Sequence, residues 1–312
     1  MRAFRIHPVS VLIAASLITA VLTTGCRQST PPSSAATPSA STSPIVDTAA
    51  WQSAVDAFIA GYLTHYPTFA ANAGKHEFDG KLPDWSAAGL AENARWLHAQ
   101  RGAIAAFTDD RLDAGTRFQR DYVLSVIDGQ LFWLEDSGFA YNNPGFYSGD
   151  LSPSMYLTRP YAPLPQRMAA FTTYLEALPK AIGQMRGNFR TPLPASYIDL
   201  GVNTFGGYAT FFRNDVPAIF AQVDDEALQS RMKTALDAAI QATQGSADWF
   251  AAQKPQATQD FAFGADKFAK MLLATERVGL SLDELKAMGE ADLARNLAAL
   301  QAACGQYAAG MT

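Results

Sequence analysis

The stretch WQSAVDAFIAGYL, residues 51–63, places apolar side chains at intervals of three and four. Trp51, Phe58 and Tyr62 therefore fall on one face of a helix, which is the pattern of an amphipathic helix packed against a core. Pro67 follows and predicts the end of this helix, because proline lacks the backbone N–H that a helix interior needs.

The same spacing continues along most of the chain and predicts an all-α fold, a multi-helix array. Ser86 is the expected cap of the second helix, and Ser281 with Glu284 forms a capping box before the last one. Pro179 is expected to break or kink the helix that contains it. No stretch alternates polar and apolar residues long enough to predict a sheet. The expected helices after the first cover residues 87–107, 116–135, 167–189, 195–212, 216–222, 225–253 and 282–304.

Helical spacing also predicts which side chains are buried. In the third helix, the inward-facing residues are expected to be Phe118, Tyr122, Ile127, Leu131 and Leu134. In the last helix, Cys304 is expected to be a small buried apolar residue, since no neighbouring group would activate its thiol.

The chain of 312 residues is long enough for one large core or two modest ones. Hydrophobic residues make up 48% and charged residues 17%, which is typical of a folded protein. The formal net charge of −5 would become −7 if a leader carrying Arg2 and Arg5 were removed. An acidic chain offers no basic surface for nucleic acid, so we expect no nucleic-acid partner.

The N-terminus has the features of an export signal. Arg2 and Arg5 precede an apolar run over residues 9–22, which is shorter than the roughly 20 residues that span a bilayer. The run ends in Leu-Thr-Thr-Gly-Cys, which resembles a bacterial lipoprotein box. We therefore expect residues 1–25 to be a signal peptide and Cys26 to be lipidated. Ordinary secretory cleavage and a short uncleaved anchor are the alternatives.

After Cys26 the chain is rich in proline, serine, alanine and threonine up to residue 48. Such a composition buries little apolar surface and predicts a disordered tether. The helical domain is then expected over residues 49–312. Together these features predict a periplasmic protein held at a bacterial membrane, the outer membrane being the favoured one, through Cys26.

Residues 138–165 form the main exception to helical spacing, because they are rich in proline, glycine and tyrosine. Long irregular segments of this kind are often functional or pack over a core. The segment is interpreted either as an aromatic lid over the helices or as a ligand-contacting loop. In the second case Tyr147, Tyr156 and Tyr161 would line a cleft.

No catalytic or metal site is visible in the spacing. His76-Glu77 begins like the zinc-peptidase motif H-E-x-x-H, but Gly80 occupies the position of the second histidine. This region is interpreted as an exposed loop. His65 and His98 have no histidine or cysteine three or four residues away and are expected at the surface or at a helix end. The acidic clusters fall at expected helix starts, where carboxylates stabilise the helix dipole.

Three segments carry a family resemblance. They are Tyr66–Gly80 (YPTFAANAGKHEFDG), followed by Leu-Pro-Asp; Arg167-Met168-Ala169 through Leu178-Pro179; and Gly264–Leu273 (GADKFAKMLL) with the helix from Leu282 to Leu300 and its Gly289. In combination they resemble the bacterial family called domain of unknown function 885, from about residue 49 to the end.

The resemblance implies an all-helical zinc metallopeptidase of the clamshell type. Its metal motif, His-Glu-x-x-x-Gly-His, would lie in the C-terminal half of a chain about twice as long, and no position here matches it. The resemblance therefore implies the N-terminal half of such an enzyme, with no catalytic or metal residue and no cofactor in this chain. Peptides and the missing C-terminal half would be its partners.

A second hypothesis remains open, in which the chain is a helical lipoprotein that binds a peptide or partner through the 138–165 segment. An inactive paralogue of the enzyme would have the same sequence features.

Overall fold

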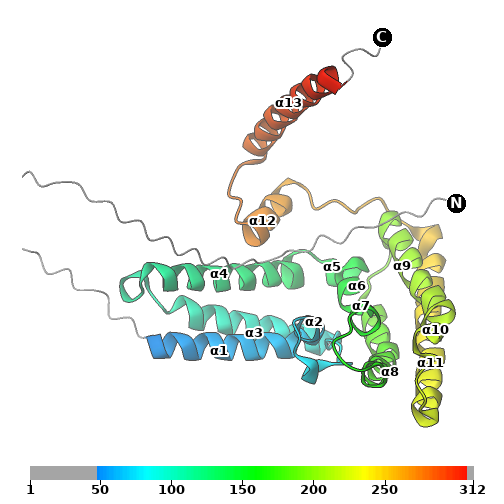
Figure 1. The fold of residues 1–312 in the computed structure, drawn as a ribbon. Helices are drawn as coiled ribbons and strands as arrows, with labels where there is room; N and C mark the ends of the chain where they lie inside the picture. The colour runs from blue at the N-terminus through cyan, green and yellow to red at the C-terminus, as the bar shows by residue number, and fades with distance from the viewer. Residues whose placement is uncertain (1–47, 308–312) are drawn as a thin grey trace, which may run out of the picture. The chain divides into compact units, whose positions relative to one another are not determined.

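The computed structural model describes residues 48–307, and within this range the protein is built from α-helices joined by turns and loops (Figure 1). No strand occurs in the described residues; an isolated bridge pairs Pro194 with Thr258. The expected all-α class is therefore confirmed. The expected signal peptide, Cys26 and the tether up to residue 47 lie outside the described residues.

Three helices form the first layer: α1 (Thr48–His65), α3 (Ala87–Ala105) and α4 (Ala114–Leu131). They lie side by side in Figure 1. A cluster of apolar side chains joins them, consisting of Trp51, Phe58, Leu97, Ile104, Val123, Ile127 and Leu131. Each helix thus buries one stripe between its neighbours, which is the packing that the spacing at residues 51–63 predicts.

Local signals start these helices as expected. The Ser86 hydroxyl accepts a hydrogen bond from the Gly89 N–H at 3.0 Å, which caps α3. Asp113 caps α4 in the same way through the Thr116 N–H at 2.8 Å. Pro67 begins a short helix, α2 (Pro67–Asn72), because its fixed φ suits the first turn.

The inward face of α4 was predicted only in part. Ile127 and Leu131 are buried, but Phe118 is 74% exposed and Tyr122 is 59% exposed. The buried stripe instead begins at Val123, one residue after Tyr122 and so rotated by about 100° around the helix. The prediction for Phe118 and Tyr122 is wrong. The apolar face of α4 is wider than the face that packs against α1 and α3, so these two apolar residues lie outside the contact.

The second group contains α8 (Leu164–Asn188), α9 (Ala195–Asn214), α10 (Val216–Phe220) and α11 (Glu226–Gln253). Its core is rich in aromatic rings, among them Phe171, Phe205, Phe212 and Phe250, which are fully buried. The α8 helix continues through Pro179, so the expected break is absent. Leu175, Leu178 and Ile182 are buried on both sides of the proline, and this packing offsets the hydrogen bond that proline removes.

The segment between these groups folds into short helices: α5 (Phe139–Asn142), α6 (Gly145–Ser148), the 3-10 turn η4 (Gly149–Leu151) and α7 (Ser154–Thr158). Its buried members include Tyr147, Leu151 and Met155, which belong to the same core as α8. The segment predicted as irregular therefore covers the core, as expected of an aromatic lid.

Beyond α11, the 3-10 turn η5 (Lys254–Gln256) leads to α12 (Ala265–Glu276) and α13 (Leu282–Tyr307). The capping box of α13 is present, since the Glu284 N–H donates to Ser281 Oγ and the Ser281 N–H donates to the Glu284 carboxylate. No residue of α13 is buried, and Cys304 is exposed. The expectation that Cys304 is buried is wrong, because none of the described residues covers this face of α13.

None of the described helices combines the length and hydrophobicity needed to cross a membrane.

Candidate functional site

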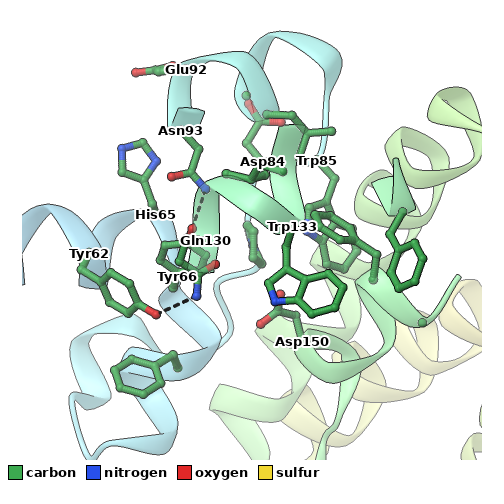
Figure 2. Close-up of a pocket in the computed structure, with 18 of the residues that line it drawn as sticks. Tyr62, His65, Tyr66, Asp84, Trp85, Glu92, Asn93, Gln130, Trp133 and Asp150 are labelled. Carbon is green, nitrogen blue, oxygen red and sulfur yellow. Dashed lines mark hydrogen bonds between the residues drawn. The ribbon is translucent and has the colours of Figure 1, made fainter. Parts of the chain in front are cut away.

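A pocket of about 780 Å3 opens beside the C-terminal end of α1 (Figure 2). Its walls come from α1, α2, the loop before α3, the first turns of α3, the end of α4 with the turn that follows it, the segment 139–150 and Leu200 of α9. The volume lies within the range of pockets that bind small ligands or peptide side chains. Segments that are distant in sequence thus meet at one site.

Aromatic rings from several elements line the pocket. They are Tyr62, Tyr66, Phe69, Trp85, Trp133, Phe139 and Phe146. Aromatic walls of this kind bind apolar groups and the faces of planar or cationic groups.

A π-helical turn, η3 (Phe132–Asp136), brings Trp133 to the pocket at the end of α4. The turn is closed by a hydrogen bond from the Ser137 N–H to the Phe132 carbonyl at 2.8 Å, and the Ser137 hydroxyl donates to the Trp133 carbonyl at 2.7 Å. Such turns insert a residue into a helix and frequently occur at functional sites. Here the inserted turn directs Trp133 away from the α1–α3–α4 core and against Phe139, at 5.4 Å between ring centroids.

Two tyrosine hydroxyls are held in place by side-chain amides, as the dashed lines in Figure 2 show. The Gln130 amide donates to the Tyr62 hydroxyl at 3.2 Å, and the Asn93 amide donates to the Tyr66 hydroxyl at 3.1 Å. Each hydroxyl accepts one hydrogen bond and keeps its own proton, so each can donate to a ligand. The other amide atom of Asn93, Oδ1, is buried without a partner in the described residues.

Asp150 is the most perturbed acid of the pocket. It lies in η4, and its backbone carbonyl accepts a hydrogen bond from the Thr68 hydroxyl at 3.4 Å. Within residues 48–307 its carboxylate has neither a hydrogen-bond partner nor an ion-pair partner. Burial raises the pKa of this carboxyl to about 6. An unpaired carboxyl in a pocket, with a pKa near neutrality, is a common feature of functional sites.

The remaining ionisable groups of the pocket are Asp84, Glu92 and His65. The Asp84 carboxylate accepts from the Ser86 N–H at 3.1 Å and from the Gln184 amide at 2.6 Å, and these bonds lower its pKa. Burial lowers the pKa of His65, whose ring packs against Trp96 at 4.8 Å between centroids. At neutral pH His65 is therefore uncharged.

The three tyrosines expected in a cleft do not line this pocket. Tyr147 is fully buried; its hydroxyl donates to the Ala140 carbonyl at 2.6 Å and accepts from Asn188 at 3.0 Å. Tyr156 is buried and accepts from the Gly80 N–H at 2.9 Å. Tyr161 is half-buried, and its hydroxyl donates to Asp79 at 2.9 Å. In the described residues these hydroxyls hold the 138–165 segment in place, and a ligand contact by them stays a prediction.

The histidines are on separate elements, with separate partners. His65 ends α1, as expected of a helix-terminal residue. His76 lies in the 3-10 turn η1 (His76–Phe78), exposed, stacked on Tyr161 at 4.1 Å and 3.3 Å from the Asp79 carboxylate. His98 contacts Glu135 at 2.9 Å on the surface. The interpretation of His76-Glu77 as an exposed turn is confirmed.

No group of three or more histidine, cysteine, aspartate or glutamate side chains in residues 48–307 is arranged to hold a metal ion. The metal motif that the family resemblance implies would lie outside this chain, and the described residues supply no set of ligands in its place.

Sequence reasoning did not find the pocket, because its residues follow no motif. Asp150 and the Tyr62–Tyr66 pair are separated by more than eighty positions, and only the fold brings them together. The composition of residues 138–165 was the one available signal. It indicated a segment that does line the pocket, but it favoured the tyrosines of that segment and not Asp150.

Comparisons with known proteins agree with the fold. A sequence model of the family described as "Bacterial protein of unknown function (DUF885)" matches residues 67–311. A solved structure from Shewanella oneidensis, described as a putative lipoprotein of unknown function, has a TM-score of 0.70 and 21% sequence identity. The alignment covers 78% of this chain and 46% of that one, so this chain spans about half the length of that protein. At this identity the likeness shows the fold alone. No curated protein matches the chain.

Proposed function

This chain belongs to the bacterial family DUF885, and we propose that its aromatic pocket binds peptides for an envelope-anchored zinc metallopeptidase whose hydrolytic residues lie outside this chain. The observation that carries the proposal is the pocket itself. It is large enough for a peptide side chain and its neighbouring backbone, and it presents hydroxyl donors beside aromatic walls.

Two observations support the proposal that this chain binds the peptide while residues outside it carry out hydrolysis: the donor groups that are present and the extent of the structural match. The described residues offer aromatic and amide groups for binding but no set of metal ligands. The structural relative is about twice as long as the aligned region. We propose that this helical body forms one half of a clamshell, as the family resemblance implies, and that it contributes a wall of the substrate cleft.

The location is proposed from two features. The Shewanella oneidensis protein is described as a lipoprotein, and this chain begins with a lipoprotein-like leader ending at Cys26. Diacylated Cys26 would hold the body in the periplasm, at the outer membrane. Replacing Cys26 by serine is expected to move the protein from the membrane fraction to the soluble fraction. Retention of the Cys26→Ser variant in membranes would contradict the proposed anchor.

Peptide binding is tested by calorimetric titration of the purified protein with acetylated and amidated tetrapeptides that differ at the third position. Trp133→Ala removes a pocket wall and is expected to weaken binding by about tenfold or more, because burying a large apolar side chain is worth about 1.5–3 kcal/mol. Phe118→Ala removes an aromatic ring that is exposed outside the pocket and is expected to leave the affinity unchanged. Equal effects of the two variants, or no binding of any tetrapeptide, would overturn the proposal.

The second candidate is a binding module that takes part in no hydrolysis. It is favoured by the fact that the pocket is formed within the described residues. The two candidate functions predict different coding sequences beyond codon 312 of the gene. A continuous reading frame that encodes His-Glu-x-x-x-Gly-His supports the metallopeptidase, and a frame without this motif supports the binding module or an inactive paralogue.

A further inference from the structure

The charges of the pocket have one sign. Its walls carry Asp84, Glu92 and Asp150, and no lysine or arginine lines it. The one basic ring, His65, is uncharged at neutral pH because burial lowers its pKa. Within the described residues the pocket is therefore an acidic hollow without an internal counter-charge.

Asp150 differs from other partly buried carboxylates of the fold. Asp128 is paired with Arg101 at 2.6 Å and with Arg277 at 3.6 Å, and Asp79 accepts from the Tyr161 hydroxyl. Asp150 has no such partner in residues 48–307 and bears the full effect of burial. A half-buried carboxylate without a partner is less well solvated than one at the surface, so a cation that reaches it gains a charge-assisted interaction.

The surroundings of Asp150 also suit a cation. The hydroxyls of Tyr62 and Tyr66, held by Gln130 and Asn93, line the same pocket as Asp150 and can donate to a ligand there. The rings of Trp133, Phe69 and Phe146 line the same hollow. Aromatic faces attract organic cations through the ring quadrupole, most strongly where water is excluded.

We infer that this pocket recognises a primary ammonium group on an aliphatic stem, with Asp150 as its counter-charge and the aromatic rings as walls around the stem. This inference rests on the proposed function, and it specifies the substrate class as peptides that carry an ammonium group. The group has two sources in a peptide, a lysine side chain and a free N-terminus, and they are separated by the choice of probes.

The experiment compares three tetrapeptides by calorimetry: a blocked peptide with lysine at the third position, the same peptide with norleucine, and the norleucine peptide with a free N-terminus. Norleucine keeps the apolar stem and removes only the charge. The blocked lysine peptide, the free N-terminal peptide or both are expected to bind at least about tenfold more tightly than the blocked norleucine peptide, as a charge-assisted hydrogen bond predicts. Which of them does so identifies the source of the ammonium group.

The Asp150→Asn variant is expected to bind the charged peptides only as tightly as it binds the blocked norleucine peptide. Its affinity for the blocked norleucine peptide is expected to equal that of the natural protein. Asp248→Asn is the matched control, because Asp248 is an exposed carboxylate on α11 outside the pocket, bonded to Gln244. It is expected to leave all three affinities unchanged.

Failure of the inference and failure of the proposed function give different results. If all three peptides bind equally, peptide binding stands and the ammonium preference is overturned. If no peptide binds, the proposed function fails, and the preference is then tested by comparing the binding of n-pentylammonium with that of n-pentanol. Tighter binding of n-pentylammonium that is lost in Asp150→Asn supports the preference, and equal binding or no binding of the two probes overturns it.

Discussion

The rings of Tyr62 and Tyr66 lie 4.4 Å apart, and each hydroxyl accepts a hydrogen bond from a different side-chain amide. Tyr62 is in the last turn of α1, and Tyr66 immediately precedes α2. Their amide partners are on α4 and α3. One pair of aromatic residues thus ties the first helical layer together at the edge of the pocket.

The two hydroxyls are expected to differ in their effect on stability. Tyr66→Phe leaves the buried amide of Asn93 without any partner in the described residues, since its Oδ1 already has none. This change is expected to lower the free energy of unfolding by about 1–3 kcal/mol. In Tyr62→Phe the freed amide is that of Gln130, which is half-buried and can reach water, so a smaller loss is expected. Urea unfolding of both variants measures the difference, and equal losses would contradict the reading of Asn93 as buried and dependent on Tyr66.

Asp150 is expected to destabilise the fold at high pH. Because burial raises its pKa in the folded state to about 6, the folded state binds this proton more tightly than the unfolded state. The stabilising effect of the proton is complete below the unfolded pKa of about 4 and is lost as the pH rises through about 6. Asp150→Asn is therefore expected to be more stable than the natural protein at pH 8, by about 1–3 kcal/mol, and equally stable at about pH 4.

Thermal and urea unfolding between these pH values test this expectation. The neighbouring ionisable groups, His65, Asp84, Glu92, Tyr62 and Tyr66, are the same in both proteins, so their own titration cancels in the difference to first order. A stability difference that does not change with pH would show that Asp150 is solvated or paired in the folded protein.

Close packing between α9 and α11 depends on Gly201. A Cβ at this position would lie 2.5 Å from the ring of Phe250, which is fully buried and cannot move aside. Gly201→Ala is therefore expected to destabilise the protein by about 1–3 kcal/mol through overpacking. Gly207, on the same helix, has open space around its Cβ position. Gly207→Ala is expected to stabilise by about 0.5–1 kcal/mol, because alanine loses less backbone entropy in a helix. Loss of stability in Gly207→Ala, or none in Gly201→Ala, would contradict the packing of α9 on α11.

Helix positions could be read from the sequence because they depend on local signals. Ser86, Asp225 and the Ser281–Glu284 pair each mark a helix start that the structure contains. Burial was harder to predict, because it depends on which other helices pack against a side chain in the folded protein. Phe118 and Cys304 have the apolar character of core residues and are nevertheless exposed among the described residues.

The candidate site could not be predicted from the sequence, because it too depends on which elements pack together. A tyrosine-rich segment predicted aromatic contacts, and Tyr147 makes them in the core rather than in the pocket. The ionisable residue of interest, Asp150, stands in Gly-Asp-Leu without any motif. Burial raises its pKa in a pocket that it shares with residues of α1, α2 and the end of α4, and no local pattern encodes that arrangement.

Photocrosslinking shows directly whether this chain binds peptides in the aromatic pocket. The blocked lysine tetrapeptide, with a diazirine group on the residue after the lysine, is irradiated with the purified protein, and the adducts are located by tandem mass spectrometry. We expect adducts on pocket residues such as Tyr66, Trp133 and Phe146, and we expect unlabelled peptide to suppress them. Suppressible adducts confined to residues outside the pocket would contradict it.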